Sequence, residues 1–245
     1  MAQLSRKVMT TYRIERARDS ESLARQASET IATQISLVLE QRDRCTIALS
    51  GGSTPAKAYS LLGQEHLPWD RVDVLLGDER WVAADDASSN ARMLKSTLLA
   101  GGPGASAHFH AVPTVELSDA DASAVAFAEL VTRLCPGEPP VFDVLLLGLG
   151  DDGHTASLFP GTEAPDVRDR WATVGRGKGL DRITLTAPVL SAAREVMFLV
   201  GGAGKNEALR RLIDTNESPQ RTPARLVQPA NGVLILADQD ASAGL

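Results

Sequence analysis

The sequence predicts an α/β protein with a doubly wound, mostly parallel Rossmann-like sheet, in three α/β/α layers with a small accessory region. Five short apolar runs have the length of strands covered on both faces, and segments of helical periodicity separate them. The runs lie at residues 45–49, 72–76, 141–147, 195–200 and 232–237. This alternation, without a repeat or an interdomain linker, predicts a single domain over residues 1–245.

The composition argues against nucleic-acid and membrane partners. The net charge is −6 and aromatic residues make up 4% of the chain, so neither a broad basic surface nor a base-stacking platform is expected. No apolar run approaches the length of a membrane span and no signal peptide is visible, which predicts a cytoplasmic protein. We expect a monomer or a small homo-oligomer, with Cys45 and Cys135 as reduced core thiols.

The first part of the chain leads into a loop that suits an anion. Residues 1–18 are read as an edge strand or an extended arm, and periodic apolar residues predict a helix over 19–41. After the strand at 45–49 comes GGSTP, where Thr54 is the predicted N-cap and Pro55 the first helical residue. Bare N–H groups, hydroxyls and a helix dipole predict a phosphate site, and a βα turn that binds nothing is the alternative. Its predicted donors are Gly51, Gly52, Ser53 and Thr54.

A second polar loop, GDERWV, follows the strand at 72–76. Its Asp78, Glu79 and Arg80 either are solvated or face a ligand at the carboxyl end of the strand. A helix is expected to open at residues 88–90 and run to about 99, with a possible strand at 109–112. Another helix is expected from Ser118 to about residue 135.

The stretch 141–161, VFDVLLLGLGDDGHTASLFPG, joins a buried strand to a dense polar loop. His154 is the only histidine set among carboxylates and glycines, and an ordinary pKa of about 6.5 suits a general base. Asp152, or alternatively Asp151, would hold the imidazole and stabilise its protonated form. The backbone groups predicted to face an oxyanion are those of Gly52, Gly150 and Gly153.

The C-terminal part supplies further cations. A weak strand is expected at 171–174, followed by a mobile GRGKGL segment and an alternating strand at 182–186 that carries Arg182. A short helix at 188–193 precedes the strand at 195–200. That strand ends in GGAGK, where Lys205 opens a helix and is either a phosphate contact or solvated.

Three patterns suggest a nucleotide or a metal site, but the residues around each of them argue against that function. Residues 148–153 fit GxGxxG, but Pro160 and Gly161 leave no room for the long helix of a dinucleotide site. The GGAGK loop lacks the first glycine and the Ser/Thr of a nucleoside triphosphate loop. The remaining histidines, His66, His108 and His110, lack nearby cysteines or a carboxylate cluster, so no metal and no cofactor is expected.

The loops GGSTP, GDERWV, DGHTASLFPG and GGAGK, with RITLTAPVL, closely resemble the 6-phosphogluconolactonase family over nearly the whole chain. That family is related in fold to glucosamine-6-phosphate deaminases, whose loops read differently: here Arg80 replaces a tyrosine, and Ser157-Leu158-Phe159 replaces Phe-Asn-Glu. One departure is the segment 176–181, RGKGLD, where lactonases often carry Lys-Pro-Pro. A noncatalytic sugar-phosphate sensor on the same fold is a further alternative.

The resemblance implies hydrolysis of 6-phospho-D-glucono-1,5-lactone, a small sugar phosphate lactone, to 6-phosphogluconate. His154 would activate a water, and neither a metal nor a covalent nucleophile is required for an activated ester. Arg80 and Lys205 would bind the 6-phosphate with help from Ser53 and Thr54. Asp78 and Glu79 would orient Arg80 or contact sugar hydroxyls, and Arg182 is a further phosphate candidate.

Overall fold

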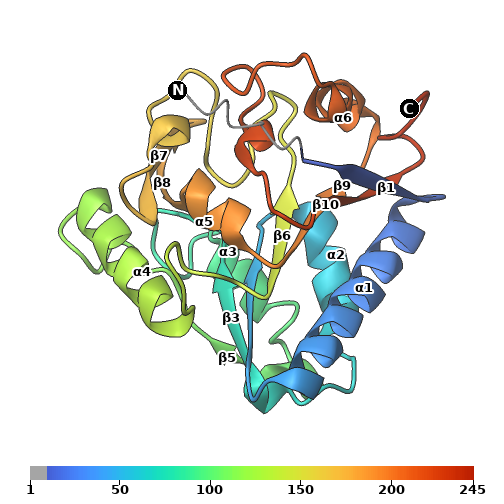
Figure 1. Cartoon of the computed structure of the whole chain (residues 1–245). Coiled ribbons are helices and arrows are strands. Elements are labelled where there is room, and N and C mark those ends of the chain that lie inside the picture. The colour runs from blue at the N-terminus through green and yellow to red at the C-terminus, as the bar shows by residue number, and fades with distance from the viewer. Residues whose placement is uncertain (1–9) are drawn as a thin grey trace, which may run out of the picture.

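Seven parallel strands form the central sheet (Figure 1), and the structure, a computed structural model, describes residues 10–245. Residues 1–9 of the predicted arm lie outside the described residues. Across the sheet the strands are β1 (Tyr12–Ala17), β10 (Val233–Asp238), β9 (Glu195–Val200), β6 (Val144–Gly148), β2 (Cys45–Leu49), β3 (Val72–Leu76) and β5 (His108–Phe109). The predicted fold class and the predicted edge strand are therefore confirmed, with β5 shorter than the run expected at 109–112.

The strand order contains a reversal beside β2. From β2 the chain adds β3 and β5 on one side, and it then returns to place β6, β9 and β10 on the other side. Such a reversal opens a crevice at the carboxyl ends of the two strands where the direction changes. Here those strands are β2 and β6, which pair in parallel.

Six α-helices flank the sheets in the described part of the chain (Figure 1). They are α1 (Ser20–Gln41), α2 (Ser53–Leu62), α3 (Asn90–Lys95), α4 (Ala120–Leu134), α5 (Ala187–Ala192) and α6 (Asn206–Ile213). The longest, α1, begins after an Asp19 cap and buries Leu23, Ala27, Ile31 and Ile35 against α2 and the β1–β10 edge, as its periodicity predicts. Within residues 10–245, no helix is both long and apolar enough to cross a membrane.

A second, antiparallel sheet forms the accessory region. It consists of β4 (Asp78–Arg80), β8 (Leu180–Leu185) and β7 (Ala172–Gly177), with α4 packed on β7 and β8. Residues 78–80, expected as a loop, form a strand, and the GRGKGL segment forms the end of the β7–β8 hairpin. Lys178 and Gly179 both have positive φ, 55° and 79°, as a two-residue hairpin turn requires.

One continuous apolar core connects the two sheets. It includes Ile47 and Leu147 from the central sheet and Val174 and Ile183 from the small one, all buried. Both cysteines are buried free thiols, as predicted. Burial raises the pKa of each cysteine to about 12, so neither thiol is reactive near neutral pH.

Candidate active site

Four loops that follow neighbouring strands meet in one cleft of about 230 Å³. The strands are β9, β6, β2 and β3, which are adjacent in the central sheet, so their carboxyl-end loops share one edge. Most of the predicted site residues line this cleft: Gly51, Gly52, Ser53, Thr54, Asp78, Arg80, Gly150, His154, Arg182 and Lys205. Asp152 and Gly153 are not part of its surface.

The GGSTP loop begins α2 two residues earlier than the predicted start. Gly52 is the N-cap, with a φ of 120° that glycine adopts readily, and no side chain caps the helix. The hydroxyls of Ser53 and Thr54, which line the cleft, are therefore not used for capping. Among residues 10–245, the N–H groups of Gly51 and Gly52 have no acceptor. This helix start therefore presents free donors to the cleft.

Strand β4 separates the roles of its two acids. Asp78 lines the cleft and its Oδ2 accepts a 2.5 Å hydrogen bond from Ser157 Oγ. Glu79 is 2% exposed and points away, to accept from the N–H groups of Asn90 (2.8 Å) and Ala91 (2.7 Å). Burial raises the pKa of Glu79, against the opposing effect of these bonds. Glu79 thus anchors the start of α3, and Asp78 faces the ligand space.

Two arginines lie side by side at the cleft. Arg80 on β4 pairs in register with Arg182 on β8, and Asp78 is close enough to act on the charge of Arg182. Burial lowers the pKa of Arg182, Asp78 raises it, and Arg80 lowers it further. The Nε atoms of both arginines are buried and lack an acceptor among the described residues. An anion in the cleft beside the two guanidinium groups would relieve their repulsion.

His154 is held by Asp152 in the turn after β6. Its Nδ1 is hydrogen-bonded to Asp152 Oδ1, which also accepts from the His154 backbone N–H at 3.1 Å. The His154 ring packs on Phe159 with centroids 4.5 Å apart, and its side chain is 15% exposed. Burial lowers the pKa of His154 below 6.5, although the bond to Asp152 opposes that shift. The imidazole is therefore neutral at pH 7.

The neighbouring Asp151 has a different partner. Its Oδ1 lies 3.4 Å from the Nζ of Lys178 at the tip of the β7–β8 hairpin. Burial raises the pKa of Asp152, but the hydrogen bonds from His154 outweigh it, so the pKa is lowered and the carboxylate stays charged. Of the two candidate acids, Asp152 is the one that touches the imidazole.

The predicted oxyanion donors of this turn are engaged elsewhere. The Gly150 N–H donates to the His154 carbonyl at 2.8 Å, and the Gly153 N–H donates to the Gly150 carbonyl at 3.0 Å. Gly150 and Gly153 therefore close the turn on itself, and their placement disagrees with the oxyanion prediction. Gly52, whose N–H has no acceptor in the described chain, is the predicted donor that stays open.

Gly150 also leaves the space that the imidazole fills. A Cβ at this position would lie 2.0 Å from His154 Nδ1 and 2.5 Å from Asp152 Oδ1. We expect Gly150→Ala to displace the imidazole and cut turnover by at least ~10², the range assigned to a general base. Stopped-flow or coupled assays measure the loss, and circular dichroism checks the fold. Turnover of Gly150→Ala near that of the parent protein would contradict this role of Gly150.

Three residues of the site were not among the site residues predicted from the sequence. Asn90 lines the cleft from the first turn of α3, Ser157 bonds Asp78, and Phe159 lies between His154 and Arg182. The Arg182 guanidinium sits 5.3 Å from the centre of the Phe159 ring. These contacts form where separate loops meet, so no local sequence pattern predicts them.

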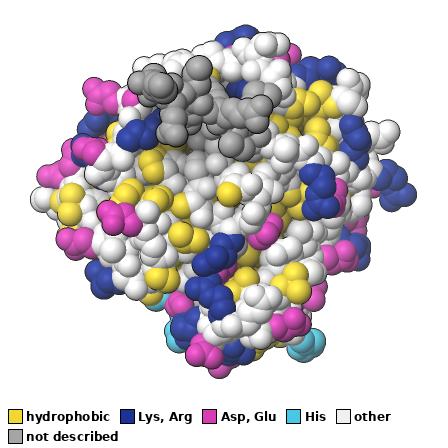
Figure 2. Space-filling view, in the orientation of Figure 1, with side chains coloured by type: hydrophobic (Ala, Val, Ile, Leu, Met, Phe, Trp, Pro, Cys, Tyr) yellow, Lys and Arg dark blue, Asp and Glu magenta, His cyan; other side chains and the backbone are white. Residues whose placement is uncertain are grey.

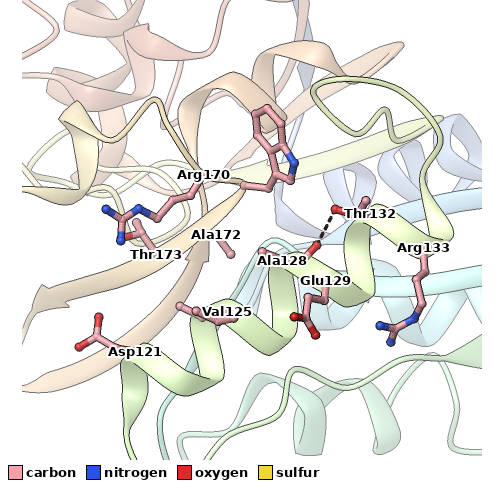
Figure 3. Close-up of a pocket in the computed structure, with 11 residues that line it drawn as sticks. Asp121, Val125, Ala128, Glu129, Thr132, Arg133, Arg170, Ala172 and Thr173 are labelled. Atoms are coloured by element: carbon pink, nitrogen blue, oxygen red, sulfur yellow. Dashed lines mark hydrogen bonds between the residues drawn. The ribbon is translucent and has the colours of Figure 1, made fainter.

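Other surface features do not offer comparable chemistry. A larger groove of about 580 Å³ lies between α4 and β7, where apolar residues such as Val125 and Ala172 are flanked by charged ones such as Asp121 (Figure 3), and none of its lining residues borders the cleft. His108 and His110 bond Asp70 O (2.9 Å) and Asp73 Oδ1 (2.8 Å) near the start of β3. No group of three or more potential metal ligands occurs within residues 10–245. On the face drawn in Figure 2, acidic and basic side chains are interspersed.

Comparisons with known proteins identify the family of the chain. Residues 18–236 match the family described as glucosamine-6-phosphate isomerases/6-phosphogluconolactonase. A 6-phosphogluconolactonase from Nostoc sp. is 42% identical over 229 residues, covering 93% of this chain and 95% of the relative. One from Synechocystis sp. is 41% identical with the same coverage.

Solved structures give the same result. The 6-phosphogluconolactonase of Trypanosoma brucei superposes with a TM-score of 0.85 at 28% identity, covering 96% of this chain and 99% of that one. A monomeric glucosamine-6-phosphate deaminase shares the fold, with a TM-score of 0.80 at 20% identity over 94% of this chain and 99% of that one. The chain therefore belongs to the glucosamine-6-phosphate isomerase/6-phosphogluconolactonase family.

Proposed function

We propose that the protein hydrolyses 6-phospho-D-glucono-1,5-lactone to 6-phospho-D-gluconate, a step of the oxidative pentose phosphate pathway. The observation that carries the proposal is one cleft that combines a neutral His154, held by Asp152, with the cations Arg80, Arg182 and Lys205. The first group suits water activation and the second suits a phosphate. Relatives that cover nearly the whole chain bear the name of this activity.

The chemical step uses His154 as general base. With its Nδ1 proton donated to Asp152, the imidazole has a lone pair at Nε2 for the proton of a water molecule. The water oxygen bonds to C1 of the lactone as the carbonyl π pair moves to oxygen. When this pair returns, the bond from C1 to the ring oxygen breaks, and the imidazolium protonates that oxygen. The products are an open-chain acid and neutral His154.

The anchoring half of the site holds the 6-phosphate, which is remote from C1. Arg80 offers a planar guanidinium and Lys205 a point charge, while Ser53 and Thr54 add hydroxyls at the start of α2. Arg182, on the strand paired with Arg80, adds charge beside the Phe159 ring. Binding energy from the phosphate orients the ring so that C1 meets the water. The Gly52 N–H is the backbone donor that we assign to the oxyanion.

The deaminase alternative is less well supported by the residues at the site. Ser157 is bonded to Asp78, and Phe159 packs between His154 and Arg182. Neither side chain offers a carboxylate for ring opening or amine departure. Phe159 instead limits the solvent contact of the imidazole.

A coupled assay tests the function. The purified protein should accelerate hydrolysis of the phosphorylated lactone above its spontaneous rate, and a chelator should leave that rate unchanged. Ammonia released from glucosamine 6-phosphate would identify a deaminase instead. Binding of 6-phosphogluconate without acceleration of hydrolysis would identify a sensor.

The pH dependence should report His154. Since burial lowers its pKa, kcat/KM should be constant near pH 7 and fall as pH drops through a midpoint below 6.5. Asp152 raises this pKa, so Asp152→Asn should move the midpoint to still lower pH. An NMR titration of the His154 imidazole measures both values independently of turnover, and a midpoint above 6.5 in the parent protein would contradict the assignment.

The same shift links stability to pH. The unfolded chain, with a histidine pKa of about 6.5, binds a proton more readily than the folded protein. The contribution of His154 to the free energy of unfolding is therefore present above pH 6.5. It is lost as the pH falls through the lower folded-state pKa.

A further inference from the structure

Asn90 is held in the cleft by one hydrogen bond from its backbone and one from its side chain. Its backbone N–H donates to the buried Glu79 Oε1 at 2.8 Å, and its side-chain Nδ2 donates to the Asp78 carbonyl at 2.8 Å. The residue is only 1% exposed, yet it lines the cleft. These bonds set the orientation of the carboxamide, because a flipped amide would place two oxygens against each other.

The carboxamide oxygen occupies space that a glycine leaves open. A Cβ on Gly51 would lie 1.9 Å from Asn90 Oδ1, so the oxygen stands directly beside the GGSTP loop. No donor within residues 10–245 reaches this oxygen, although Nδ2 of the same amide is paired. The oxygen is not among the buried polar atoms that lack a partner, so it is open to the cleft and free to accept a hydrogen bond from a ligand hydroxyl.

The chemistry of a sugar lactone determines what can meet this oxygen. Phosphate and lactone carbonyl oxygens accept hydrogen bonds, and they suit the arginines, the lysine and the N–H groups of the cleft. Only the ring hydroxyls of the lactone can donate. Asn90 Oδ1 is an acceptor surrounded by donors, so it is suited to a hydroxyl of the sugar. The same holds for Asp78 Oδ1, because the other carboxylate oxygen, Oδ2, already accepts a hydrogen bond from Ser157.

We propose that Asn90 is a specificity-determining residue whose Oδ1 accepts a hydrogen bond from one ring hydroxyl of the sugar. Asp78 Oδ1 accepts from a neighbouring hydroxyl. This inference rests on the proposed lactonase function and adds to it a means of distinguishing sugars that carry the same phosphate. A site built to bond a hydroxyl rejects the analogue that lacks it.

The test combines Asn90→Leu, which keeps the volume and removes the acceptor, with four phosphorylated lactones: the parent compound and its 2-, 3- and 4-deoxy analogues. On the parent lactone the variant should lose roughly 10- to 100-fold in kcat/KM, the loss expected for one buried hydrogen bond. On the deoxy analogue that lacks the bonded hydroxyl, parent protein and variant should differ by less than about threefold. An equal loss on all four lactones would overturn the proposal.

Two further variants distinguish a direct hydrogen bond to the sugar from a structural role in holding α3. Asn90→Asp retains an acceptor but loses the bond to Asp78, so its dependence on the critical hydroxyl should persist. Glu79→Gln loosens α3 without facing the cleft, and its effect should be equal on all four lactones. If Asn90→Leu does not fold, Asn90→Ala provides the same comparison. A parent protein inactive on every lactone would refute the proposed function itself, whereas an active one with uniform losses refutes only the role of Asn90.

Discussion

His154→Ala is expected to reduce kcat by at least ~10², the smallest effect usual for a general base, while the fold is retained. The His154 side chain bonds Asp152 within one turn and packs on one aromatic ring, that of Phe159, so its loss removes little apolar contact. The turn keeps the bond from the Gly150 N–H to the carbonyl of residue 154, which needs no imidazole. Initial rates on the phosphorylated lactone, corrected for spontaneous hydrolysis, give the result.

The matched control is His66→Gln, which removes an exposed histidine that does not line the cleft. Its activity should equal that of the parent protein. Substrate affinity should change little in His154→Ala, because the phosphate contacts remain. Turnover of His154→Ala near the parent rate would end the assignment of His154 as the base.

Arg80→Ala is expected to weaken transition-state binding of the phosphorylated lactone by about 2–5 kcal/mol, the range for truncating one partner of a buried charge pair. Arg182 would stay in place with Asp78 beside it, but the variant also loses the bond from Arg80 Nη1 to the Ser88 carbonyl, so circular dichroism checks the fold. The decisive comparison is with unphosphorylated glucono-1,5-lactone, on which the variant should act almost as the parent protein does. Values of kcat/KM on both substrates measure the difference.

A general loss of positive charge must be distinguished from the loss of a contact. Arg176→Ala removes an equal charge from the β7–β8 hairpin, where the side chain is 60% exposed and does not line the cleft. That control should leave both substrates unaffected at moderate ionic strength. Equal losses of Arg80→Ala on the two lactones would reject the phosphate role.

The apolar runs were sufficient to predict five of the seven strands of the central sheet. A strand such as Val72–Leu76 is buried at every position, so its continuous apolar run can be recognised without knowing which strands it pairs with. Parallel strands end their loops at a common edge, which is why GGSTP, DGH and GGAGK could be placed together before any contact was known. The small sheet was harder to predict from the sequence, because Asp78–Arg80 is a strand only through its pairing with β8.

Glycine explains the other differences. In GRGKGL the glycines suggested mobility, whereas Gly177 lets the hairpin approach the Phe159 ring, where a Cβ would come within 2.5 Å. In GGSTP, Gly52 moves the helix start ahead of Thr54. Gly150 and Gly153 looked like free donors, yet their N–H groups close the turn. The sequence identifies such glycines but not the atoms that approach them.

The pairing of Lys178 with Asp151 ties two segments that are distant along the chain. The hairpin tip contacts the turn that carries the imidazole, at an exposed ion pair of 3.4 Å. Exposed pairs of this kind contribute about 0–1 kcal/mol, so the connection can open without unfolding either segment. Deeper in the protein the hairpin and this loop stay joined by the buried bond from the Ser157 N–H to Thr184 Oγ1 (3.1 Å), so a spectroscopic probe at position 178 would report on the loop that carries His154 without replacing a buried contact.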